Sequence, residues 1–230
     1  MTAAAKGLIT GSARFCRRDG SIVHASQDSD GMLVPDLKDI LSVDVQSVKW
    51  ILVIEKEATF RSISASDYWR ELSNTGIMIT AKGYPDIATR ALLKFLSDPS
   101  PQNGFAAPPV YALVDFDPDG LAILSTYKHG SANLAHETAH LQLPRVQHLG
   151  LGRSHIVASN DSLASQNLLT LTARDRKKAR MMLGWNVLAD ENEMRTDLQV
   201  MLMLNVKSEL QLLDAVPNGM MRLLEQGLPT

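Results

Sequence analysis

Three short apolar runs constrain the fold of this 230-residue chain more than any other feature. They cover residues 50–54, 76–80 and 110–114, and stretches long enough to form helices separate them. Apolar runs of this length between helical segments are typical of buried strands in βαβ units, which build mainly parallel sheets. Hydrophobic residues make up 45% of the chain, enough for a substantial core. We therefore predict an α/β fold in which helices flank a mainly parallel sheet.

The intervening stretches predict the helices and one more strand. Apolar spacing indicates a helix over residues 57–72, a second over 85–96 that opens at a proline, and a third over 120–128. A loop rich in Pro, Gly and Ser covers residues 97–109. The apolar stretch over 146–151 predicts a further strand.

The two ends of the chain differ from this centre. Short extended pieces and turns near the start indicate a β-rich N-terminal arm over residues 1–45. The core then covers residues 46–160, and a helical C-terminal extension packed on the core covers 161–230. In that extension the pattern beyond Leu168 is wholly helical, and one apolar helix face is expected to comprise Met194, Leu198, Met201, Leu202, Val206, Leu210 and Leu213.

Composition limits the classes of function. Lys and Arg number 23 and Asp and Glu 25, so the net charge of −2 does not indicate a nucleic-acid binder, and any DNA contact must come from a local patch. The single cysteine, Cys16, excludes an internal disulfide. The N-terminus lacks the pattern of a signal peptide, and no apolar run is long enough to cross a bilayer. We expect no membrane association.

Three carboxylates follow the first and third apolar runs, at the point where each of these two runs ends. Glu55 follows residues 50–54, and Asp115 and Asp117 follow residues 110–114. If the two strands are neighbours, these acids lie together at the carboxyl edge of the sheet, where α/β folds usually bind ligands. Such a cluster needs a cation, and a set of oxygen ligands suits Mg²⁺. The alternative for each acid is a helix cap.

Several ordered motifs carry a resemblance to a known family. They are Val53-Ile54-Glu55-Lys56-Glu57-Ala58-Thr59-Phe60, Lys82-Gly83-Tyr84-Pro85-Asp86 with Thr89-Arg90, Asp115-Phe116-Asp117-Pro118-Asp119-Gly120, Leu149-Gly150-Leu151 with Ser154, and the stretch from Leu171 to Ala179. Together they resemble the TOPRIM region of the topoisomerase VI A subunit family, and most of all its eukaryotic branch that makes meiotic double-strand breaks.

The resemblance implies a fold and a function. It implies a TOPRIM-type α/β domain in which Glu55, Asp115 and Asp117 hold Mg²⁺, with Mn²⁺ as a substitute, beside the scissile phosphate of duplex DNA. It also implies a type II topoisomerase-like transesterase that breaks DNA to initiate meiotic recombination. Its partners would be a second copy in a homodimer, meiotic accessory proteins and a topoisomerase VI B-like subunit, on chromosomes in the nucleus.

The chain departs from this family in its tyrosines. The family's nucleophile is a tyrosine on a winged-helix domain that precedes the TOPRIM region, in a setting of arginine and acidic residues. The four tyrosines here are Tyr68, Tyr84, Tyr111 and Tyr127, and none has that setting. We expect that the winged-helix domain is absent from this chain and that the chain alone is inactive.

Basic and small residues beside the acids are candidates for DNA contacts. The set comprises Lys56, Arg61, Lys82, Gly83, Tyr84 and Arg90. Such contacts would hold the DNA backbone without reading its sequence. The alternative is that these are ordinary solvated or ion-paired side chains. The basic run from Arg174 to Arg180 is a weaker candidate, since a solvated helix face gives the same pattern.

Two other classes of function stay open. His136-Glu137-Thr138-Ala139-His140 matches the HExxH motif of zinc hydrolases, but Pro144 follows closely and no third ligand is evident. The other alternative is a catalytically silent module for DNA binding or dimerisation.

Overall fold

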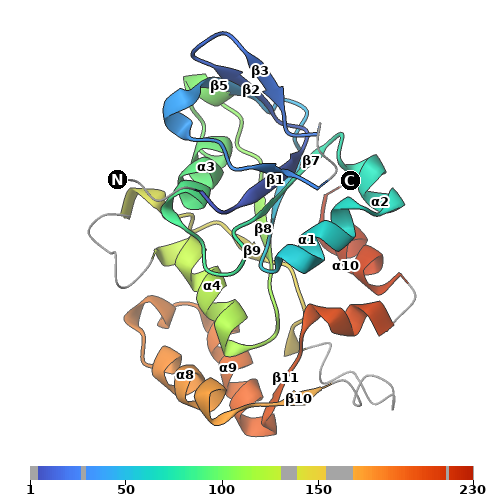
Figure 1. Cartoon of the computed structure of the whole chain (residues 1–230). Helices are drawn as coiled ribbons and strands as arrows, with labels where there is room; N and C mark the ends of the chain where they lie inside the picture. Colours follow the sequence, from blue (N-terminus) through green and yellow to red (C-terminus); the bar gives the residue numbers. More distant parts are fainter. Residues whose placement is uncertain (1–4, 27–29, 131–138, 154–167, 216–217, 230) are drawn as a thin grey trace.

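The three apolar runs form the middle of the main sheet. The computed structural model describes residues 5–26, 30–130, 139–153, 168–215 and 218–229, and within them six strands pair in the order β4-β1-β7-β6-β8-β9 (Figure 1). These strands are β1 (Leu8–Gly11), β4 (Met32–Leu33), β6 (Trp50–Ile54), β7 (Gly76–Thr80), β8 (Val110–Leu113) and β9 (Gln147–His148). Strands β7, β6, β8 and β9 are mutually parallel, whereas β1 is antiparallel to both β7 and β4. The predicted mainly parallel sheet is confirmed.

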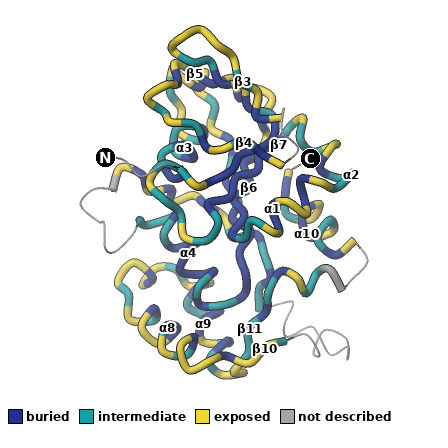
Figure 2. The backbone as a smooth tube through the Cα atoms, viewed as in Figure 1, coloured by how far each residue is buried: buried dark blue, intermediate teal, exposed yellow. Residues whose placement is uncertain are grey.

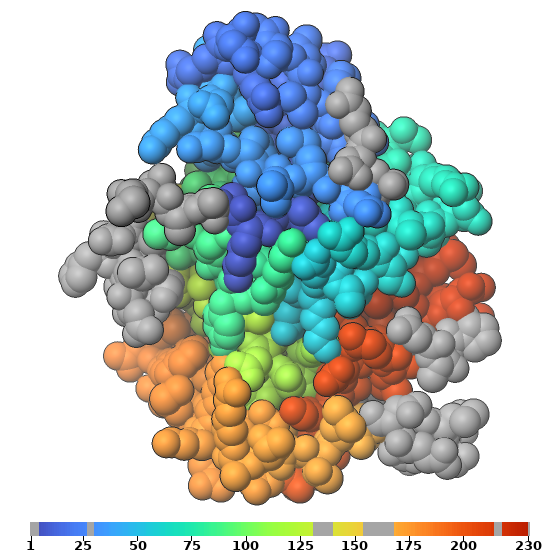
Figure 3. All heavy atoms as spheres, in the orientation of Figure 1, coloured from blue at the N-terminus to red at the C-terminus, as the bar shows by residue number. Residues whose placement is uncertain are grey.

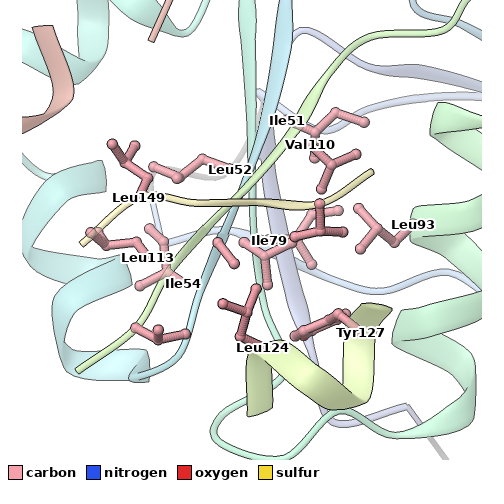
Figure 4. Close-up of a cluster of buried hydrophobic side chains, with 14 of the residues drawn as sticks. Ile51, Leu52, Ile54, Ile79, Leu93, Val110, Leu113, Leu124, Tyr127 and Leu149 are labelled. Carbon is pink, nitrogen blue, oxygen red and sulfur yellow. The ribbon is translucent and has the colours of Figure 1, made fainter. Parts of the chain in front are cut away.

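The central strands are buried on both faces, which explains their continuous apolar sequences. Every residue of β6 and β7 is buried. Gly76 opens β7 because a Cβ there would lie 2.2 Å from the ring of Trp50. Figure 4 shows Leu124 and Tyr127 packed beneath the sheet near Ile79. In Figure 2 the centre of the molecule is accordingly dark blue.

Helices cover both faces of the sheet. In Figure 1, α3 and α4 lie on one side and α1, α2 and α10 on the other. The helices are α1 (Glu57–Ser64), α2 (Asp67–Leu72), α3 (Ile87–Ser97), α4 (Pro118–His129), α8 (Ala173–Leu183), α9 (Asn192–Leu204) and α10 (Gly219–Gly227). Short 3-10 turns are η1 (Leu37–Asp39), η2 (Pro101–Asn103), η4 (Ala139–Leu141), η5 (Asn186–Leu188) and η6 (Leu210–Ala215). Among the described residues, no helix has the length and apolar character needed to cross a membrane.

Two smaller sheets flank the main one. Strands β2 (Arg14–Arg17), β3 (Ile22–His24) and β5 (Ile40–Asp44) form an antiparallel sheet at one end of the molecule, and β10 (Leu169–Thr170) pairs with β11 (Val206–Lys207) at the other. The N-terminal region is thus β-rich, as predicted, but β1 and β4 belong to the main sheet. The domain boundaries at residues 45 and 160 stay predictions.

Local polar groups shift several element boundaries from their predicted positions. The helix predicted over 57–72 is broken, because Ser66 Oγ accepts a hydrogen bond from Trp69 N and starts a new helix there. The helix predicted from Pro85 starts at Ile87, because Asp86 caps it through Thr89 N at 2.7 Å.

The region beyond Leu168 is not wholly helical, so that prediction was wrong in detail. Helix α9 ends at Leu204, because Asn205 adopts a left-handed conformation with φ 55°. Residues 206 and 207 then form β11. The predicted single apolar face therefore divides: Met194, Leu198 and Met201 are buried on α9, whereas Leu210 is buried beyond the helix. Strand β9 likewise spans only residues 147 and 148 of the stretch predicted over 146–151.

Candidate metal centre at the carboxyl edge of the sheet

Glu55 and Asp115 meet where β6 and β8 end. The parallel register pairs Ile54 with Leu113, and Glu55 N donates to Leu113 O at 3.0 Å. The Glu55 side chain turns toward the neighbouring strand, where its Oε2 accepts a hydrogen bond from Asp115 N at 3.0 Å. Glu55 is 9% exposed and Asp115 is 2% exposed. Two of the three predicted acids therefore lie together in a largely buried place.

Both carboxylate oxygens of Asp115 are engaged. Oδ1 accepts a hydrogen bond from the backbone N of Leu210 at 2.8 Å, and Oδ2 forms an ion pair with Lys56 Nζ at 2.8 Å. A buried carboxylate needs partners of this kind, because removing its charge from water is costly. The partners come from distant parts of the chain, so Asp115 joins the start of the core to its C-terminal part.

Asp117 lies at the start of α4 and caps it. Its Oδ1 accepts a hydrogen bond from Gly120 N at 2.7 Å, so the helix-cap role that the sequence left open is present in the structure. Gly120 permits a close approach: a Cβ there would lie 2.4 Å from Asp115 O and 3.1 Å from Glu55 Oε2. The first turn of α4 thus packs directly against the other two acids.

Two of the three acids have a raised pKa. Burial, together with the neighbouring charge of Asp115, raises the pKa of Glu55 to about 7, and its hydrogen bond from Asp115 N offsets only part of this rise. Burial, together with the charges of Asp115 and Asp119, also raises the pKa of Asp117. These carboxylates therefore disfavour one another's ionisation, which a bound cation would relieve.

The donor chemistry fits a hard divalent cation. Carboxylate oxygens are the ligands that Mg²⁺ prefers, and the ammonium of Lys56 already stands beside Asp115 as a positive charge. Within the described ranges, no three His, Cys, Asp or Glu side chains converge tightly enough to hold an ion as they stand. A metal would therefore compete with contacts that Asp115 and Asp117 make at present.

The loop of residues 82–84 lies against the same edge. Gly83 N donates to Glu55 O at 2.8 Å. Tyr84 Oη donates to Asp119 Oδ1 at 3.2 Å, and Lys178 Nζ of α8 contacts both of those oxygens. The same ammonium lies 5.1 Å from the centroid of the Tyr84 ring. Tyr84 thus belongs to a polar cluster beside the acids.

The remaining predicted DNA-contact residues divide into two groups. Lys82 and Arg61 are partly exposed, and both pair with Glu57, at 3.2 and 2.8 Å. Arg90 is only 1% exposed, in the core near Tyr127. Its burial removes it from the surface that DNA could touch, whereas Lys82 and Arg61 stay accessible.

Residues 206–211, hereafter the covering segment, were missed by the sequence reasoning. Phe116 and Ser208 exchange backbone hydrogen bonds at 2.9 and 3.0 Å, and Leu210 N reaches Asp115. Glu209 Oε2 pairs with Lys56 Nζ at 3.1 Å. In Figure 3 the yellow-green atoms of α4 accordingly lie between orange atoms of α8 and red atoms of the C-terminal region. The covering segment has the sequence pattern of an apolar helix, which concealed its role.

The zinc alternative falls mostly outside the described residues. His136, Glu137 and Thr138 are not among them, so the structure does not test the HExxH motif. Ser154, which belongs to the motif with Leu149-Gly150-Leu151, also lies outside the described residues.

Comparisons with known proteins identify the family of the chain. Residues 50–225 match the family model for the Toprim domain of Spo11 and the topoisomerase 6 A subunit. The chain is 34% identical over 208 residues to "Meiotic recombination protein SPO11" of Homo sapiens, covering 90% of this chain and 50% of the relative. It is 36% identical over 216 residues to "Meiotic recombination protein SPO11-1" of Oryza sativa subsp. japonica, covering 92% and 53%.

An archaeal protein is also similar. The A subunit of type 2 DNA topoisomerase 6 from Aeropyrum pernix is 27% identical over 217 residues, covering 90% of this chain and 53% of the relative. The chain thus spans about half the length of these curated relatives. Because the family model covers most of the chain, including both strands of the acidic edge, the chain belongs to the family of Spo11 and the topoisomerase 6 A subunit, whose Toprim domain it contains.

Proposed function

We propose that this chain is the metal-binding part of a topoisomerase VI A-like DNA transesterase that makes the double-strand breaks of meiotic recombination. The observation that carries the proposal is the hydrogen bond from Asp115 N to Glu55 Oε2 at the carboxyl edge, with Asp117 two residues further on at the start of α4. The relatives named as meiotic recombination proteins favour the meiotic role over a general topoisomerase role.

Glu55, Asp115 and Asp117 would hold Mg²⁺, for which Mn²⁺ could substitute. When bound, the cation would stabilise negative charge that builds on the phosphate as the bond breaks. The chain's own residues would fix the position of this charge. Asp117 is held by its cap on α4 and Glu55 by its bond to Asp115 N, so neither carboxylate needs a large reorganisation of the backbone.

The attacking hydroxyl would come from a tyrosine outside these 230 residues. Tyr127 is 1% exposed, and Tyr68 and Tyr111 lie on α2 and β8, away from the carboxyl edge. Tyr84 is near the acids, but its hydroxyl is held by Asp119 and Lys178. The chain alone should therefore bind DNA weakly and should not cut it.

Duplex DNA is the proposed substrate, and the exposed part of the edge is the proposed contact surface. Lys82, Gly83 and Tyr84 form the loop beside Glu55, and Lys56 and Arg61 complete the proposed set of contacts. Arg90 is left out because it is buried. In the full-length protein we further propose a homodimer on chromosomes in the nucleus, with meiotic accessory proteins and a topoisomerase VI B-like subunit as partners.

A DNA-binding measurement tests this proposal. Fluorescence anisotropy of a labelled duplex should show salt-sensitive binding that Mg²⁺ strengthens, and Asp115→Asn should remove the effect of Mg²⁺. Asp67→Asn, a change at an exposed aspartate on α2, is the matched control. DNA binding that neither Mg²⁺ nor Asp115→Asn changes would favour the alternative of a catalytically silent DNA-binding module.

A cleavage assay tests the second part. Supercoiled plasmid incubated with the chain and Mg²⁺ or Mn²⁺ should stay intact, without protein-linked 5′ ends. Nicking that disappears with Asp117→Ala would instead make this domain a nuclease in its own right.

A further inference from the structure

Lys56 links a proposed metal ligand to the covering segment. Among the ion pairs of the described residues, no other side chain pairs with both. Its Nζ lies 2.8 Å from Asp115 Oδ2, 3.1 Å from Glu209 Oε2 and 3.2 Å from Gln211 Oε1. The ammonium is thus shared between a buried carboxylate and two groups near the surface.

The charges around Lys56 explain why it lies there. Asp115 is 3% exposed in its side chain, and Glu55 and Asp117 add two more acids nearby. The ammonium of Lys56 lies within 3.1 Å of carboxylate oxygens of both Asp115 and Glu209, so two carboxylates balance its charge. The residue is therefore a lasting positive charge at the place where the acids need one.

A divalent cation at these acids would change the balance for Lys56. The cation would take over the role of counter-charge at Asp115 and would repel the neighbouring ammonium. Glu209 offers the ammonium a second partner, because its side chain is 45% exposed and already within 3.1 Å. Lys56 can thus leave Asp115 without losing every partner.

We infer that Lys56 is a built-in counter-ion for the proposed metal site, which passes from Asp115 to Glu209 when a divalent cation binds. This inference rests on the proposed function and assigns a positioning role to two residues outside the acidic set. The covering segment thereby contributes to metal binding. Once the cation is bound, Glu209 keeps Lys56 away from Asp115 and so favours the bound state. Without Glu209, the ammonium competes with the cation for Asp115.

Calorimetric titration of the whole chain with Mn²⁺ tests the inference. Lys56→Met should tighten Mn²⁺ binding by about tenfold, the change expected if an ion pair worth about 1.4 kcal/mol no longer competes. Lys56→Arg should restore an affinity near that of the wild type. Glu209→Gln should weaken binding severalfold. In the double variant, Glu209→Gln should have almost no further effect, because Glu209 acts through Lys56.

A matched control separates this mechanism from a general effect of charge. Lys207 pairs with Asp175 at 2.9 Å and lies in the same covering segment, but no ion pair joins it to Asp115 among the described residues. Lys207→Met should therefore change the Mn²⁺ affinity far less than Lys56→Met. Circular dichroism and thermal melts without metal show whether each variant is folded, and Lys56→Gln provides a second neutral variant.

The outcomes distinguish the inference from the proposed function. Mn²⁺ binding that Asp115→Asn removes but Lys56→Met leaves unchanged or weakens would overturn the inference alone. A Glu209→Gln effect that is equally large with Lys56 and with Met at position 56 would also overturn it. Absence of Mn²⁺ binding in the wild type would overturn both.

Discussion

The strand ends at Glu55 and Asp115 and the covering segment reach the same site by different means. The strand ends are held by parallel pairing of β6 with β8 and by full burial of β6. The covering segment is held by the short pairing of β11 with β10, by two backbone bonds between Phe116 and Ser208, and by polar contacts to Asp115 and Lys56. The first region makes the site rigid, whereas the second supplies partners that a ligand can displace.

The largest expected effect comes from the strand side. Leu52 on β6 is 1% exposed, and Leu52→Ala should lower the free energy of unfolding by about 3 kcal/mol, through lost burial and the cavity left behind. Guanidinium denaturation measures the change. A loss under about 1 kcal/mol would show that β6 is not tightly packed and that the strand side of the site is not rigid.

The pH dependence of stability tests the buried acids. The pKa of Glu55 rises from its ordinary value of 4.5 to about 7 in the folded protein, so the folded state holds its proton more strongly than the unfolded state. The stability that this stronger proton binding contributes is fully present below the pKa of Glu55 in the unfolded state. It is lost as pH rises through about 7, the pKa in the folded state. The predicted loss is about 3 kcal/mol.

The variant Glu55→Gln isolates this contribution. Without divalent ions, the free energy of unfolding of the wild type should fall by about 3 kcal/mol more than that of Glu55→Gln between about pH 5 and about pH 8. Parallel curves for the two proteins would contradict the raised pKa. Added Mn²⁺ should reduce the difference at the higher pH.

The sequence predicted the strand side well because its determinants are local. A continuous apolar run predicts a buried strand, and the acid that follows it must lie at the edge of the sheet. Both β6 with Glu55 and β8 with Asp115 followed this rule. That Asp117 binds a metal stays a prediction, since the contact observed for its side chain is the hydrogen bond from Gly120 N that caps α4.

The covering segment could not be predicted in the same way. Its contact with Asp115 joins residues 95 positions apart, and its donor is the backbone N of Leu210, which leaves no mark on the sequence. The left-handed Asn205 that ends α9 also carries only a weak signal, since asparagine adopts this conformation only occasionally. Similarly, the motif containing Arg90 gave no sign that its side chain is buried.

A substitution in the covering segment should have an intermediate effect. Ser208→Pro removes the N–H that donates to Phe116 O, and an unsatisfied buried carbonyl costs about 2 kcal/mol. We expect a lower melting temperature and a weaker response to Mn²⁺. Ser208→Ala is the matched control, because it keeps the N–H and the buried Oγ has no hydrogen-bond partner among the described residues. Equal effects of the two variants would show that the backbone pair does not hold the segment.

The smallest expected effect lies at the polar cluster of α8. Lys178 contacts Asp119 and Tyr84, and Lys178→Met should cost about 1 kcal/mol or less, because Asp119 is partly exposed and solvent screens the pair. Thermal melts give this value, and Arg180→Met on the exposed side of α8 serves as the control. A loss above about 3 kcal/mol would place this cluster with the rigid strand side instead.

Mn²⁺ titration of three proteins shows whether the acids at the ends of β6 and β8 bind a metal ion: the wild type, Asp115→Asn and the exposed control Asp67→Asn. Asparagine keeps an oxygen for Leu210 N, so Asp115→Asn should fold while it removes one charge from the edge. We predict measurable binding for the wild type and Asp67→Asn, and binding at least about tenfold weaker for Asp115→Asn. Identical isotherms for all three would contradict a metal centre at the ends of β6 and β8.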